Sequence, residues 1–306
     1  REFLCSEAMF HLGVPTTRAL SLVTTGEMVV RDMLYDGNPA PEIGAVVCRV
    51  APSFIRFGSF QIHTADGNHE TLSQLLKHTI ANHFPNHTID EDDGIITWLK
   101  HVAATTAEMI AHWMRVGFVH GVMNTDNMSI HGLTIDYGPY GWLENYDPNW
   151  TPNTTDLSTR RYRYGQQAQI GAWNIARLAE AVAPLMDDVQ SLYSVLEHYE
   201  NKYIEYQNAV WGQKLGIDDF AEADEALVIE LDGLLQKVET DMTIFFRMLS
   251  TIETPEIGLL ESSFYDKNTI PTDEWDTWLE KWWKRVNNKP NREAMRKANP
   301  KYVLRN

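Results

Sequence analysis

The sequence predicts an α+β fold in which a small part with short strands precedes a larger, mostly helical part. Two β-branched runs lie ahead of Pro52, whereas helical periodicity dominates from Leu72 onward. Hydrophobic residues make up 43% of the 306 residues, with 10 Trp, 12 Tyr and 11 Phe, which is enough for a substantial core. We expect residues 1–70 to form the remainder of a small lobe and residues 71–306 to form a helical lobe.

The first predicted element is a helix at the start of the chain. Leu4, Ala8 and Leu12 recur every four residues, and Gly13 and Pro15 close the run. No initiator Met or capping residue precedes this helix, and the opposite end of the chain stops within an apolar run. We therefore interpret the chain as a piece of a longer protein.

Two strands are predicted after this helix. The first, Ala19–Gly26, is interrupted by glycine before Met28–Val30. The second, Gly44–Ala51, is apolar and ends at Pro52, so we expect it to be buried. Short strands next to a helix are typical of a small α+β lobe.

Helices account for most of the remainder. One is predicted after Leu72, and a longer one ends at Gly117. The apolar face of the longer helix consists of Ile96, Leu99, Val102, Ala103, Met109, Ile110, Trp113 and Met114. Others are predicted from Gln166 to about Tyr203, from about Phe220 to Leu249, and from Glu274 to Val286. The last carries Trp275, Trp278, Trp282 and Trp283, whose helical spacing indicates core packing rather than a ligand cage.

The charge balance excludes several classes of function. With 26 Lys and Arg against 42 Asp and Glu, the net charge is −16, which argues against broad binding to nucleic acid or to an anionic membrane. No apolar stretch reaches the roughly 18–20 residues of a membrane span, and the first residues given lack the basic-then-apolar layout of a signal peptide. Cys5 and Cys48 are too few for a disulfide framework, which indicates a reducing compartment.

The segment most informative about function lies between Phe118 and Trp142, where the helical period is lost. Three side chains with oxygen ligands, Asp126, Asn127 and Asp136, are predicted on two loops that flank a hairpin. The strands of that hairpin would be anchored by Ile130, Leu133 and Ile135. Such oxygens suit Mg²⁺, which takes further ligands from phosphates and water. Turn formation is the alternative role for these residues, but their joint spacing favours a metal and nucleotide site.

The spacing of this segment matches that of protein kinases. Kinases carry H-R-D-x-x-x-x-N and then D-F-G, in which the Asn and the later Asp hold metal ions. His120 and Asn127 have the same offset here, and Asp136 begins Asp-Tyr-Gly. Val122 occupies the place of the catalytic Asp, which leaves Asp126 as the only nearby carboxylate able to act as a base. His120 is expected to make structural hydrogen bonds.

Two arginines lie among apolar neighbours, where an unpaired cation would be costly. Arg49 ends the second predicted strand, and Arg56 precedes Phe57-Gly58. Their planar guanidinium groups suit phosphate, but salt bridges to carboxylates of this acidic chain explain them equally well on local evidence. Glu2 could pair with a phosphate-holding lysine, which would have to lie upstream of this chain; an exposed helical glutamate is the simpler alternative.

Longer runs carry a more specific resemblance. They are Arg1–Met9, Gly13–Leu20, Arg49–Gly58, His120–Ser129, Asp136–Pro139 and Asn299–Asn306. In these runs the sequence resembles the SelO (YdiU) family of pseudokinases that act as protein adenylyltransferases. The resemblance implies a protein-kinase-like two-lobe fold with a partial N-terminal lobe and a mostly helical C-terminal lobe. It also implies inverted ATP binding and transfer of AMP to Ser, Thr or Tyr hydroxyls of proteins.

The resemblance further implies roles for individual residues. Asp126 would accept the proton, and Asn127 and Asp136 would bind Mg²⁺ or Mn²⁺. The remaining residues would act on the nucleotide, with Arg49 and Arg56 as phosphate contacts and Glu2 as the partner of the nucleotide-binding lysine. The location would be the cytoplasm in a bacterium or the mitochondrion in a eukaryote.

Two other functions stay open on the sequence. One is an atypical kinase that transfers the γ-phosphate of ATP, and the other is a non-catalytic, nucleotide-binding pseudokinase scaffold. The resemblance implies that the phosphate-covering loop and the lysine belong to an N-terminal portion that these 306 residues do not include. We therefore expect the chain by itself to bind nucleotide weakly and to transfer little or nothing.

Overall fold

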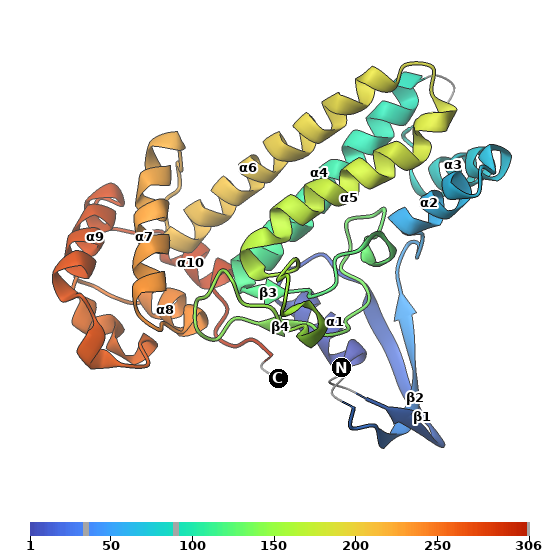
Figure 1. The fold of residues 1–306 in the computed structure, drawn as a ribbon. Helices are drawn as coiled ribbons and strands as arrows, with labels where there is room; N and C mark the ends of the chain where they lie inside the picture. The colour runs from blue at the N-terminus through green and yellow to red at the C-terminus, as the bar shows by residue number, and fades with distance from the viewer. Residues whose placement is uncertain (33–36, 88–91, 305–306) are drawn as a thin grey trace.

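The computed structural model describes residues 1–32, 37–87 and 92–304, so the last two residues of the C-terminal run lie outside it. The fold is α+β and mostly helical, with two small antiparallel sheets among the described residues (Figure 1). The strands are β1 (Arg18–Arg31), β2 (Ala40–Val50), β3 (Phe118–Val119) and β4 (Gly141–Trp142). The helices are α1 (Glu2–His11), α2 (Phe57–Ala65), α3 (His69–His83), α4 (Asp92–Val116), α5 (Gln167–Val182), α6 (Tyr193–Leu215), α7 (Glu225–Lys237), α8 (Met242–Leu249), α9 (Thr272–Arg285) and α10 (Arg292–Ala298).

Strands β1 and β2 form a long antiparallel ribbon that extends away from the helices (Figure 1). The pairing register shifts between Thr24 and Met28, at the glycine that interrupts the predicted first strand. The expectation that the second strand is buried is wrong, because Val46 and Val50 are 61% and 50% exposed. A strand is buried only when other elements cover its faces, and in the described part of the chain β2 pairs with β1 alone.

Helix α1 has nearly the predicted bounds but faces the core with different residues. Cys5 and Met9 are fully buried, whereas Leu4 is 64% exposed. The predicted row of Leu4 and Ala8 and the row of Cys5 and Met9 both have i, i+4 spacing. The elements that pack against this short helix decide which of the two rows is buried. Burial raises the pKa of the Cys5 thiol far above its usual range, so this cysteine is an apolar core residue rather than a nucleophile.

Helix α4 is the centre of the larger of two hydrophobic clusters. It lies beside α5 and α6 (Figure 1), and its predicted apolar face is buried except for Met114, which is partly buried. The same cluster contains Phe57 and Phe60 of α2 together with Leu72 of α3. Residues on both sides of position 70 therefore share one core, and the domain boundary predicted there stays a prediction.

The second cluster fills the C-terminal part of the molecule, between α7, α8, α9 and the end of α6. Trp275, Trp278 and Trp282 are at most 1% exposed there, which confirms their predicted place in the core. The indole N–H of Trp278 donates to the carbonyl of Leu227 at 2.9 Å, and that of Trp282 to Leu215 at 2.8 Å. These bonds fix α9 against the ends of two other helices.

Element boundaries differ from the predictions where capping and 3₁₀ turns intervene. Pro184 lies in a 3₁₀ turn after α5, so the helical run from Gln166 contains two helices, the second of which continues to Leu215. Asp241 caps α8 by accepting from the amide of Ile244, which separates α8 from α7. Helices α2 and α10 were not predicted.

No helix among the described residues is long and apolar enough to cross a bilayer.

A buried arginine joins the two ends of the chain to α4. Arg115 donates to the carbonyl of Leu12 after α1, and at 3.0 Å to the carbonyl of Ala298 at the end of α10. Its Nε also donates to Nδ1 of His112 at 3.0 Å. Lys214 of α6 donates to the carbonyl of Arg115 at 2.9 Å, so α1, α4, α6 and α10 meet at Arg115.

His112 makes the stability of this junction sensitive to acid. Burial, with a smaller contribution from Arg115, lowers the pKa of His112 from 6.5 to about 4. The unfolded chain therefore binds the proton first, and the free energy of unfolding should fall as pH drops below about 6.5. One pKa unit corresponds to about 1.4 kcal/mol, so protonation of His112 should lower the free energy of unfolding of the wild type by about 3 kcal/mol between pH 6.5 and pH 4. His112→Gln lacks this group, and its free energy of unfolding should fall by that much less. Urea denaturation across this range measures the difference, and parallel declines would contradict it.

Candidate functional site

The loop with the kinase-like spacing begins at β3, which pairs with β4. His120 follows β3 and is buried; its Nε2 donates to the carbonyl of Ile135 at 2.9 Å. Its Nδ1 accepts from the amide of Val122 at 3.3 Å. Burial lowers the pKa of His120, in keeping with a neutral ring. His120 thus connects the loop of Asp126 with Ile135, which directly precedes Asp136. This is the structural role that was predicted for His120.

Three side chains that the sequence analysis did not single out form hydrogen bonds to the backbone of this loop. The amide of Gln167 donates to the carbonyl of Phe118 at 2.9 Å, and its oxygen accepts from the amide of His120 at 3.1 Å. The side-chain amide of Asn174 donates to the carbonyl of Met123 at 2.9 Å, and that of Asn153 donates to the carbonyl of Gly121 at 3.0 Å. All three are buried amides. Only their burial marks them, which a single sequence does not show.

Asp126 and Asn127 lie in a single 3₁₀ turn, η1 (Thr125–Asn127). Asn127 donates from Nδ2 to the carbonyl of Val122 at 2.9 Å, which closes the loop on itself. The hairpin predicted between the two polar loops is not formed: one isolated bridge joins Met128 to Thr134. The segment is too short and too tightly turned for a ladder, and the strand pair lies outside it, between β3 and β4.

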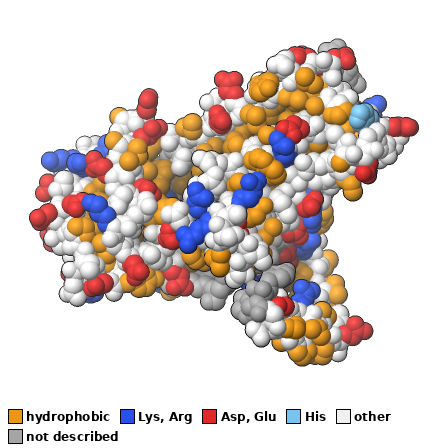
Figure 2. Space-filling model, viewed as in Figure 1, with side chains coloured by type: hydrophobic (Ala, Val, Ile, Leu, Met, Phe, Trp, Pro, Cys, Tyr) orange, Lys and Arg blue, Asp and Glu red, His pale blue; other side chains and the backbone are white. Residues whose placement is uncertain are grey.

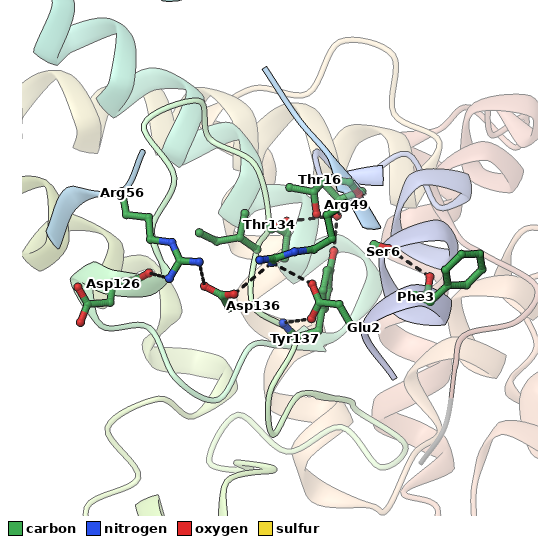
Figure 3. Close-up of polar contacts among 12 residues, drawn as sticks. Glu2, Phe3, Ser6, Thr16, Arg49, Arg56, Asp126, Thr134, Asp136 and Tyr137 are labelled. Carbon is green, nitrogen blue, oxygen red and sulfur yellow. Dashed lines mark hydrogen bonds and ion pairs between the residues drawn. The ribbon is translucent and has the colours of Figure 1, made fainter. Parts of the chain in front are cut away.

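Asp136 lies between the two arginines (Figure 3). Oδ1 of Asp136 is 3.1 Å from Nη1 of Arg49, and Oδ2 is 2.7 Å from Nη2 of Arg56. All three side chains are 25–29% exposed, so these ion pairs are partly desolvated. Asp136 also has a positive φ of 56°, unusual for a residue other than glycine. Such strain at a polar cluster is typical of functional sites.

Glu2 is the fourth member of this cluster. Its Oε1 is 3.2 Å from the same Nη1 of Arg49, and its Oε2 accepts from the amide of Tyr137 at 3.0 Å (Figure 3). Glu2 is therefore not a free surface residue. Its cationic partner within the described residues is Arg49, and the pairing of Glu2 with a nucleotide-binding lysine stays a prediction.

Arg56 also positions Asp126. The Nη1 of Arg56 donates to the backbone carbonyl of Asp126 at 2.9 Å, while the carboxylate of Asp126 points away from the guanidinium (Figure 3). That carboxylate lies against Gly58 in the first turn of α2, where an added Cβ would be 2.0 Å from Oδ1. Asp126 is exposed, and no described cation pairs with its carboxylate. An accessible, unpaired carboxylate held by its backbone is suited to proton transfer.

The donor set fits a divalent cation that arrives with its own phosphate ligands. Among residues 1–32, 37–87 and 92–304, no group of three or more His, Cys, Asp or Glu side chains could hold a metal ion. Asp136 and Asn127 supply carboxylate and amide oxygens, which suit Mg²⁺ when phosphates and water complete the shell. The two arginines beside Asp136 are the groups expected to bind phosphate.

The structure thus brings Glu2, Arg49, Arg56 and Asp136 into one ion-pair cluster, with Asp126 at its edge. Together with the kinase-like loop spacing, this arrangement defines the chain as a candidate nucleotide-dependent transferase. A family model described as "Protein adenylyltransferase SelO" matches residues 1–306. The chain belongs to the SelO family, as its sequence runs predicted.

Curated relatives agree with this assignment. Proteins named "Protein nucleotidyltransferase YdiU" are 50% identical in Flavobacterium johnsoniae, 51% in Azoarcus sp. and 50% in Rhodopirellula baltica. Each match covers 100% of this chain and 61–62% of the relative. The chain therefore spans about three fifths of the length of these relatives.

The ion-pair cluster makes a prediction about stability. Arg49→Gln would leave the half-buried carboxylates of Glu2 and Asp136 without their shared cation, and should lower the free energy of unfolding by about 1–2 kcal/mol. The matched control is Lys281→Gln, because Lys281 and its partner Glu230 are 52% and 44% exposed, and its replacement should have a smaller effect. Urea denaturation of both variants tests this, and equal losses would show that the cluster contributes nothing special.

Proposed function

We propose that the protein is a Mg²⁺-dependent adenylyltransferase that moves AMP from ATP to Ser, Thr or Tyr hydroxyls of proteins. The observation that carries this proposal is the joint position of Asp136, Arg49 and Arg56 beside the loop of Asp126. A protein-kinase-like arrangement of two lobes, with the cluster between them, is part of the same proposal. The name of the family model and the names of the relatives support it.

The cluster is suited to a change of partners. Two anions and two cations neutralise one another in the described structure, as Glu2 and Asp136 face Arg49 and Arg56. Metal-bound phosphate carries both a cation and an anion, so Asp136 can turn to the metal while the arginines turn to phosphate. The bound metal would neutralise charge that develops on the phosphates during transfer.

Asp126 is the proposed base. The place of the usual kinase base is taken by Val122, whose backbone only supports His120 and Asn127. The carboxylate of Asp126 is exposed, so it can accept the proton of an incoming hydroxyl as the oxygen attacks phosphorus. The close contact with Gly58 limits where this carboxylate can lie.

The position of the label after incubation with ATP tests the proposal. Full-length protein and a generic acceptor protein are incubated with Mg²⁺ and ATP labelled at either the α- or the γ-phosphate. We expect α-label on protein. Label from the γ position alone would establish the atypical kinase, and no label from either position would establish the scaffold.

The same assay tests the residues. Asp126→Asn and Asp136→Asn should each lower the labelling rate by about 10²-fold or more, the usual contribution of a general base or of a group that stabilises transferred charge. Asp273→Asn, in the exposed first turn of α9, is the matched control and should label like the wild type. Full activity of either test variant would remove that residue from the mechanism.

A further inference from the structure

A group of basic side chains lies on one face of this acidic chain. Figure 2 shows Lys and Arg side chains gathered near the middle of one face, over the start of α5. We call this group the arginine patch and define it as Arg160, Arg161, Arg163 and Arg177 around Trp173. These four arginines lie within 18 residues of a chain whose net charge is −16.

Most of the patch has no internal anion. Arg177 pairs with Glu180, but none of Arg160, Arg161 and Arg163 forms an ion pair with a described carboxylate. Arg163 instead donates to the backbone carbonyl of Arg160 at 3.1 Å. Cationic side chains without an ion-pair partner of their own are available to an external anion.

The patch is held in place by its surroundings. The guanidinium carbons of Arg161 and Arg177 lie 4.6 and 5.5 Å from the ring centre of Trp173, which is 39% exposed. Cation–π contacts of this kind orient guanidinium groups while their N–H edges stay available to carboxylates. The buried carboxylate of Asp156 accepts from the amides of Arg161 and Tyr162 at 2.9 and 2.8 Å, which fixes the loop.

The patch is also tied to the loop of Asp126. Trp173 is next to Asn174, which holds the carbonyl of Met123, and the loop before the patch carries Asn153, which holds Gly121. A molecule bound at the patch is therefore held at a fixed position relative to this loop, which lies beside the start of α5 (Figure 1).

We propose that the arginine patch docks an acidic segment of the protein whose hydroxyl accepts the nucleotide. The proposal rests on the adenylyltransferase function and adds a preference for acceptors with carboxylates near the modified hydroxyl. A short acidic segment needs to contact only the patch, whereas a long polyanion such as nucleic acid would also be repelled by a chain whose net charge is −16. Because the Debye length is about 8 Å at physiological salt, the patch acts at short range.

Peptide binding without nucleotide tests the proposal. The full-length protein is titrated into a fluorescein-labelled peptide of alternating Glu and Ser, and into its Gln and Ser counterpart, with anisotropy as the readout. We expect the Glu peptide to bind more tightly, and Arg160→Glu/Arg161→Glu to weaken it by about tenfold or more. Arg160→Lys/Arg161→Lys keeps the charge and should retain most of the binding.

The matched control is Lys284→Glu/Lys289→Glu, which alters the net charge equally at exposed positions near the end of α9. It should leave the affinity within about twofold of the wild type. Equal weakening by both double variants, or equal binding of the two peptides, would overturn the proposal. So would a single-stranded oligonucleotide that binds the patch more tightly than the Glu peptide. Since no nucleotide transfer is needed, this result is independent of whether the adenylyltransferase proposal holds.

Discussion

One guanidinium group that contacts two carboxylates at once organises the candidate site. Arg49 joins Glu2 of α1 to Asp136, and Arg56 joins Asp136 to the loop of Asp126. These residues come from the first helix, the end of β2, the start of α2 and two loops more than 60 residues further along the chain. A half-buried charge must find a partner, and this requirement draws the five segments to one place.

The helical part of the molecule keeps the cluster in position. Buried amides of Gln167 and Asn174 on α5 hold the loop that follows β3, and His120 spans the distance to Ile135. Arg115 of α4 meanwhile ties the end of α1 to α10, so the helix that carries Glu2 is fixed to the same core. The strained Asp136 is thus surrounded by contacts that keep it in place.

The sequence was sufficient for the helical body, and it singled out the four residues that the structure brings together as ion pairs. Strong periodicity placed α4 and the tryptophans of α9, because a long amphipathic helix has few alternative ways to pack. It was not sufficient to predict the exposure of β2 or the inward row of α1, since these depend on neighbours distant in sequence. Whether Arg49 and Arg56 bind phosphate or pair with carboxylates was left open for the same reason, and the partners Glu2 and Asp136 were not identified. The supporting amides of Asn153, Gln167 and Asn174 carry no sequence signal, because only their burial in the structure marks them.

Calorimetric titration of ATP into the full-length protein, with Mg²⁺ and then with excess EDTA, tests the central claim most directly. If Asp136 exchanges its arginine partners for a metal that arrives with phosphate, the wild type should bind ATP at least about tenfold more tightly with Mg²⁺. Asp136→Asn should lose most of that difference while keeping its fold. Equal affinity of the wild type with and without the metal would contradict the account.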